Sequence, residues 1–255
     1  MALLRVDFFS DVLGLSTSMT VILPQRTSRQ IGLTGRSSGA APPVLYLLHG
    51  LSDDDTIWTR RTSIERYAAA YGLAVVMPQV HTSFYSDEVS GLPFWTFMTE
   101  ELPVLVQSLF RVSADPADTF VAGLSMGGYG AMKWALRHPD RVAAAASLSG
   151  ALGLTGAPDG RDPAFDRLMA TVFGGPITGS DDDVLHLAST TEPGRCPRLY
   201  VACGTDDFLL SSSRRFVDIA DRRGLPITAR IGPGDHDWEY WDAQIQDVLA
   251  WLPLR

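Results

Sequence analysis

Short apolar runs of strand length alternate with longer helical segments from residue 44 onward. Runs that are apolar throughout are typical of strands buried on both faces of a parallel sheet; they cover residues 44–48, 73–77, 119–122, 143–148, 199–202 and 227–231. The segments between them predict helices at 63–71, with Ser63 as the cap, and at 95–109, 126–137, 211–223 and 239–251. This alternation predicts an α/β fold, with a mostly parallel central sheet and helices on both faces.

Four other segments depart from this alternation. Residues 3–9 and 17–23 alternate apolar and polar positions, which predicts two antiparallel strands at the start of the sheet. Pro24 to Pro43 is rich in Gly, Ser, Arg and Thr and predicts a surface loop. Residues 151–195 have no strong period and predict a small cap-like insertion near the top of the sheet. We expect residues 1–255 to form a single domain, which is an ordinary size for an α/β fold.

Pro103 lies within the predicted helix 95–109. Proline removes one backbone donor, so it predicts a kink or a late helix start.

Composition excludes several classes of function. The net charge is -8 and Lys and Arg never form a run longer than a pair, so the chain lacks the basic surface of a nucleic-acid binder. The first residues have no basic start or apolar stretch, and no later segment is apolar for long enough to span a bilayer, which predicts a cytoplasmic protein without membrane association. The two cysteines, Cys196 and Cys203, predict reduced thiols rather than a disulfide or zinc site.

The strongest chemical signal is the stretch Gly-Leu-Ser-Met-Gly at residues 123–127. It follows a predicted strand and precedes a predicted helix, which is the context of the nucleophile elbow of α/β-hydrolases. The tight turn requires small residues beside the serine and lifts its hydroxyl above the sheet. The pattern therefore predicts that Ser125 is a nucleophile.

A serine hydroxyl needs a base within hydrogen-bonding distance, and histidine is the usual one. His236 lies directly after the last predicted strand and before the last helix, where the order Ser, acid, His puts the base in this fold. The other histidines fit other roles: a loop-shaping residue at His49, a pocket residue at His81, a helix cap at His138 and a residue of the insertion at His186.

The acid of such a triad should follow a core strand between these two residues. Asp206 and Asp207 are the carboxylates that do so, and either could reach the imidazole. The oxyanion that forms during acyl transfer needs backbone amides aimed at it. We expect these amides at Met126, after the nucleophile, and at Leu51, where Gly50 lets the backbone approach the substrate.

With these residues in hand, the chain resembles the esterase D-like family of α/β-hydrolases, and within it the bacterial tributyrin esterases. The matching stretches are residues 44–52, 58–67, 75–78, 99–103 and 122–130 and the loops at Asp207 and His236. The resemblance implies a serine carboxylesterase acting on short-chain acyl esters through an acyl-enzyme, without metal or cofactor. It also implies that Asp207, third after Gly204, is the acid and that Leu51 and Met126 form the oxyanion hole.

The substrate predicted by this resemblance is a small-molecule ester, and a homo-oligomer is left open. A compact pocket is predicted around Gly50, although core packing is the alternative for most of the aromatic rings; its other candidate residues are His81, Trp58, Tyr85, Trp95 and Trp238. The acidic run at residues 181–183 predicts a turn or helix start, without the spacing of a metal site. The alternatives are an S-formylglutathione hydrolase, a feruloyl or acetyl-sugar esterase, an acyltransferase, and an inactive binding protein on a hydrolase fold.

Overall fold

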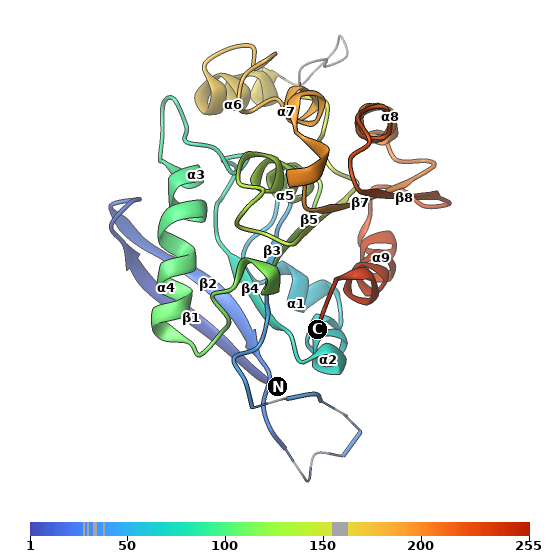
Figure 1. The fold of residues 1–255 in the computed structure, drawn as a ribbon. Coiled ribbons are helices and arrows are strands. Elements are labelled where there is room, and N and C mark those ends of the chain that lie inside the picture. Colours follow the sequence, from blue (N-terminus) through green and yellow to red (C-terminus); the bar gives the residue numbers. More distant parts are fainter. Residues whose placement is uncertain (28, 30, 33–34, 38, 155–162) are drawn as a thin grey trace.

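The computed structural model describes residues 1–255 except 28, 30, 33–34, 38 and 155–162 (Figure 1). Among the described residues a sheet of eight strands runs through the molecule in the order β1-β2-β4-β3-β5-β6-β7-β8. The strands are β1 Ala2–Ser10, β2 Leu15–Leu23, β3 Val44–Leu48, β4 Ala74–Pro78, β5 Thr119–Leu124, β6 Ala144–Leu148, β7 Arg198–Gly204 and β8 Ile227–Gly232.

The strand directions confirm the predicted sheet. β1 pairs with β2 and β2 pairs with β4 in antiparallel fashion, and every later pair, from β3–β4 to β7–β8, is parallel. Strands β3 to β6 are buried almost throughout, as their apolar runs predict. β8 differs, because it is the edge strand and has a neighbour on one side only; its residues are half-buried or exposed.

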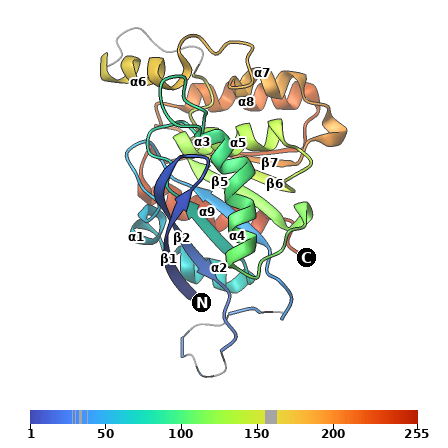
Figure 2. The same ribbon diagram turned by 90° about the vertical axis from the view of Figure 1, so that its left-hand side faces the viewer.

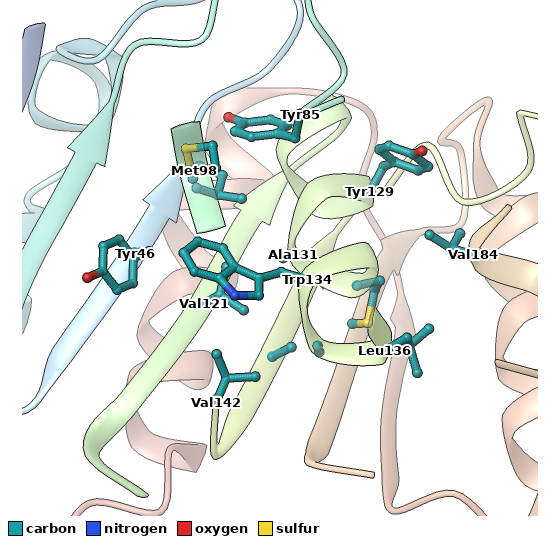
Figure 3. Packing of buried hydrophobic residues seen from close by; sticks show 14 of the residues in the cluster. Tyr46, Tyr85, Met98, Val121, Tyr129, Ala131, Trp134, Leu136, Val142 and Val184 are labelled. Carbon is teal, nitrogen blue, oxygen red and sulfur yellow. The ribbon is translucent and has the colours of Figure 1, made fainter. Parts of the chain in front are cut away.

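Helices cover both faces of the sheet (Figures 1 and 2). One face packs against α1 (Ile57–Arg61), α2 (Ile64–Tyr71) and α9 (Trp238–Trp251), and the other against α3 (Phe94–Thr96), α4 (Leu102–Leu109), α5 (Met126–Arg137) and α8 (Leu210–Arg223). α5 lies at the centre of its face, where Trp134 extends toward Tyr46 of β3 and Val121 of β5 (Figure 3). The Tyr46 and Trp134 ring centroids are 5.1 Å apart.

Two local details refine the predicted helices. A π-helical turn at Phe97–Glu101 joins α3 to α4, and Pro103, which has no N–H to donate, lies in the first turn of α4. The prediction of a late helix start holds for α4 only, because helical backbone already begins at Phe94 in α3 and continues through the π-helical turn. The predicted cap at Ser63 is wrong in detail, because its side chain makes no capping bond; the Thr62 hydroxyl accepts the Ile64 N–H instead, at 3.1 Å.

The predicted insertion contains two helices, α6 (Pro163–Phe173) and α7 (Val184–Thr190), which its sequence did not indicate. A seven-residue helix is too short to display a clear period. Buried α7 residues pack into the main core, and Asp183 caps the helix by accepting the Leu185 and His186 amides. Asp182, just before it, pairs with the fully buried Lys133 of α5 at 2.5 Å. Residues 155–162 of the predicted insertion lie outside the described residues.

Candidate active site

The turn between β5 and α5 holds Ser125 in an unusual backbone conformation. Its φ is +51° and its ψ is −115°, a region that L-residues rarely adopt. Two backbone hydrogen bonds support this conformation: the Ser125 N–H donates to Leu148 O at 2.9 Å, and the Ala151 N–H donates to Ser125 O at 3.0 Å. The carboxyl end of β6 and the segment after it therefore keep the strained serine at the edge of the sheet.

Glycines on both sides of Ser125 allow the close approach of strand and helix. A Cβ at Gly123 would lie 2.5 Å from the backbone of Gly127, and a Cβ at Gly127 would lie 2.4 Å from Leu48 O and 2.7 Å from His49 O. All of these neighbours are backbone atoms, which cannot move aside cheaply. The small residues of the elbow are thus explained by contact distances in the structure.

Three of the predicted side chains lie in hydrogen-bonding contact. The His236 Nε2 atom is 3.2 Å from Ser125 Oγ, and its Nδ1 atom is 2.9 Å from Asp207 Oδ2. The Asp207 side chain is completely buried, whereas 16% of the His236 side chain is exposed. An unbroken chain of polar atoms therefore runs from a buried carboxylate through an imidazole to the serine hydroxyl.

Two loops carry this arrangement, one after β7 and one after β8. The Thr205 N–H donates to Gly232 O at 2.8 Å and the Asp206 N–H donates to Gly234 O at 3.0 Å, so the loops are joined through their backbones. Asp206 is exposed and contributes to this junction with its amide, while Asp207 turns inward to the imidazole. Of the two carboxylates that the sequence left open, the structure brings Asp207 to His236.

Hydrogen bonds hold the pKa of Asp207 below its ordinary value. Burial by itself raises this pKa. Hydrogen bonds from His236, the Ser149 hydroxyl and the Leu209 amide lower it, and together they outweigh the effect of burial. The Leu209 N–H lies 2.7 Å from Oδ1. Asp207 is therefore a carboxylate, and a charged acceptor faces the Nδ1 side of the imidazole.

The loop after β3 approaches Ser125 from the other side. His49 is buried in it; Nδ1 donates to Gly50 O at 2.8 Å and Nε2 accepts the Val80 N–H at 3.2 Å. Burial lowers the pKa of His49, so the ring is neutral and serves to shape the loop, as predicted. In the part of the chain that the structure describes, the amides of Leu51 and Met126 donate to no protein acceptor.

The predicted substrate-contacting residues separate into two groups. Trp58, Tyr85 and Trp95 are buried to at least 93%: the first donates to Leu48 O, the second to His49 O, and the third lies under Lys133. These three rings belong to the core, and we exclude them from the substrate surface. The second group stays a prediction for the substrate surface. Trp238 is half-buried, His81 is exposed beside Phe94, and Gly50 is buried against Leu124 and Asp53.

Two aromatic residues beside His236 were missed by the sequence analysis. The Phe208 ring lies 4.5 Å from the imidazole and is 74% exposed, and Trp241 meets the imidazole edge to face at 4.9 Å. Phe208 could have been found as the neighbour of Asp207 in the sequence. Nothing in the sequence distinguishes Trp241 from the other apolar positions of its helix.

The described residues also bear on a metal site, a disulfide and a membrane-spanning helix. The described residues include no group of three or more His, Cys, Asp or Glu side chains that could hold a metal ion. Cys196 is half-buried and Cys203 is buried, and both are free thiols. Within the described ranges, every helix is too short or too polar to cross a lipid bilayer.

Comparison with known proteins agrees with this geometry. The model of the Esterase family matches residues 10–252. An acetyl esterase of Caldicellulosiruptor saccharolyticus is 30% identical, and the match covers 99% of this chain and 98% of that protein. Among solved structures, the Staphylococcus aureus S-formylglutathione hydrolase FrmB is 33% identical with a TM-score of 0.83, and the fluorophosphonate-binding serine hydrolase FphF of the same species is 32% identical with a TM-score of 0.82; each match covers 98% of both chains.

The family match spans nearly the whole chain, and both solved relatives share its complete fold. The α/β-hydrolase architecture predicted from the sequence is confirmed. The chain belongs to the Esterase family and is a serine carboxylesterase.

Proposed function

We propose that Ser125 is the nucleophile of this esterase, His236 its general base and Asp207 the acid that orients the base. The observation that carries the proposal is the continuous contact from Asp207 Oδ2 to His236 Nδ1 and from His236 Nε2 to Ser125 Oγ. In this arrangement the charged carboxylate keeps the imidazole proton on Nδ1, so that Nε2 is free to accept the serine proton.

The reaction has two steps. Ser125 Oγ bonds to the ester carbonyl carbon while His236 Nε2 takes the hydroxyl proton, and the alcohol leaves with that proton as an acyl-enzyme forms. Water then attacks the acyl-enzyme, gives its proton to the same nitrogen, and releases the carboxylic acid and the free serine. The Leu51 and Met126 amides would donate to the negatively charged oxygen in both tetrahedral intermediates.

We assign short-chain acyl esters of uncharged alcohols as the substrates, such as acetyl or butyryl esters of glycerol or sugars. The acetyl esterase relative supports this class. Four exposed carboxylates stand beside the His236 loop, at Asp206, Asp235, Asp237 and Glu239, and line a hollow there. They disfavour a substrate with excess negative charge such as S-formylglutathione, since carboxylates on the loops that carry Asp207 and His236 repel an approaching anion.

Substitution of the nucleophile tests the proposal. Ser125→Ala should lower kcat for p-nitrophenyl butyrate by a factor of roughly 10⁴ to 10⁶, and it should abolish labelling by a fluorophosphonate. Ser211→Ala, which changes an exposed serine at the start of α8, is the control and should keep full activity and labelling. If Ser125→Ala keeps more than about a tenth of the activity, Ser125 is not the nucleophile, because loss of a true nucleophile costs several decades.

The substrate class needs a separate measurement. We expect the highest kcat/KM for p-nitrophenyl esters of two to four acyl carbons when esters from acetate to laurate, a feruloyl ester and S-formylglutathione are compared. A preference for S-formylglutathione or the feruloyl ester would contradict the assignment. Product analysis with glycerol present should give mostly free acid; mostly acylglycerol would identify an acyltransferase instead.

A further inference from the structure

Ser149 occupies a position next to the active site that resembles the position of Ser125. It follows β6, the strand beside β5, and its φ is +49°. The side chain is completely buried, and its N–H donates to Ala202 O on β7 at 2.7 Å. Glycine would adopt this φ without strain, so a serine here suggests that the hydroxyl has a role.

The contacts of the Ser149 hydroxyl determine its direction. The indole Nε1–H of Trp241 donates to Ser149 Oγ at 3.1 Å. An indole nitrogen can only donate, so Oγ is the acceptor in this bond and its one proton is left for another partner. Two groups beside it can accept this proton: the Asp207 carboxylate, whose pKa is raised by burial and lowered by hydrogen bonds from His236 and from the Ser149 side chain, and the sulfur of Cys203, which is the weaker acceptor.

Trp241 ties this hydroxyl to the base as well. The edge-to-face contact between its ring and the imidazole of His236 has a centroid distance of 4.9 Å and an interplanar angle of 90°. Trp241 is buried in α9 and also packs edge to face against Trp238 at 5.2 Å. One rigid indole therefore contacts the ring of the base and also bonds to the Ser149 hydroxyl.

We propose that Ser149 is a positioning residue for the esterase reaction: its hydroxyl, directed by Trp241, holds the Asp207 carboxylate in the orientation that His236 requires. The inference rests on the proposed roles of Ser125, His236 and Asp207. Leu209 and His236 already donate to the two oxygens of Asp207 at 2.7 and 2.9 Å. The Ser149 hydroxyl adds a third donor in this proposal, and a carboxylate that is bonded on several sides cannot rotate away from the imidazole.

The neighbouring serine of β6 offers a matched control. Ser147 is as deeply buried as Ser149, and its Oγ has no hydrogen-bond partner among the described residues. Ser149→Ala should lower kcat for p-nitrophenyl butyrate about tenfold with KM changed less than about twofold, because the carboxylate acts on the transition state and not on substrate binding. Ser147→Ala should keep kcat within about twofold under the same conditions.

Two further variants separate a role through Asp207 from a loss of structure. Ser149→Gly relieves the positive φ and removes the same hydroxyl, so it should lose as much activity as Ser149→Ala. When added to Asp207→Asn, Ser149→Ala should cause little further loss, since residues that act as a unit are not additive.

These measurements decide the proposal. Full activity of either Ser149 variant, or a full tenfold loss on top of Asp207→Asn, would overturn the role of Ser149 while leaving the triad intact. High activity of Asp207→Asn alone would instead refute the proposed function. Thermal unfolding of each variant, followed by circular dichroism, checks that the compared proteins are folded.

Discussion

Replacing Asp207 by asparagine changes one atom of the carboxylate, and the structure determines which way the amide must face. Oδ1 accepts the Leu209 N–H at 2.7 Å, and Oδ2 faces His236 Nδ1 at 2.9 Å. An amide has one acceptor atom and one donor atom. If its oxygen keeps the bond from Leu209, its NH₂ group points at the imidazole.

An NH₂ group in that place favours the wrong form of His236. Two donors cannot share a hydrogen bond, so Nδ1 becomes the acceptor and the imidazole proton moves to Nε2. Nε2 lies 3.2 Å from Ser125 Oγ and can no longer take the serine proton. In serine hydrolases with this tautomer defect, kcat falls by a factor of about 10⁴, which corresponds to about 5.5 kcal/mol of transition-state stabilisation.

Initial rates of p-nitrophenyl butyrate hydrolysis measure this loss directly. We expect kcat of Asp207→Asn to fall about 10⁴-fold while KM stays within about threefold, because the residue does not contact the substrate. Asp206→Asn is the matched control, since that side chain is exposed and only its amide joins the two loops; its kcat should stay within about twofold. A larger loss for Asp206→Asn than for Asp207→Asn would refute the assignment of the acid.

Two further predictions follow from the elbow and from α5. Gly127→Ala puts a Cβ at 2.4 Å from Leu48 O and should displace the end of β3 and the loop that carries Leu51, the proposed oxyanion donor. We therefore expect kcat/KM to fall at least about 100-fold, as for loss of one oxyanion donor; Gly175→Ala, with nothing within 4 Å of its Cβ, is the control and should be fully active. Burial lowers the pKa of Lys133 from 10.5 to about 8, so between these values the unfolded chain binds more protons than the folded one. The free energy of unfolding of the native protein, measured against Lys133→Met by urea titration, should therefore rise with pH across that window by up to about 3 kcal/mol; a flat or falling difference would contradict the burial of this ammonium group.

Residues that lie close together in the sequence produced the reliable expectations. The nucleophile elbow is a five-residue pattern between a strand and a helix. A Cβ at either of its glycines would collide with backbone atoms, which is why the pattern requires small residues there. The direction of the central strands was also accessible, because apolar runs buried on both faces are typical of a parallel sheet. Short helices such as α1 and α7 were missed because fewer than two turns do not show a period.

Burial of individual side chains was harder to predict. Trp58 and Tyr85 follow strands that end at the active-site edge, yet both rings turn into the core, where their polar atoms bond to the backbone of β3 and the loop after it. Aromatic residues with one polar atom suit a pocket wall and a core equally well. Only the surrounding atoms decide between the two.

The sequence by itself determined the fold class, the family and the residue types of the esterase chemistry, because these depend on local patterns and on chain order. The tertiary structure decided that Asp207 faces the imidazole and Asp206 does not, and that Trp241 contacts both the imidazole and the Ser149 hydroxyl. The physical reason is that β5, β6, β7 and β8 lie side by side in the sheet. Their ends bring residues from 125 to 241 within hydrogen-bonding distance, and no pattern along the chain records which side chains then point toward one another.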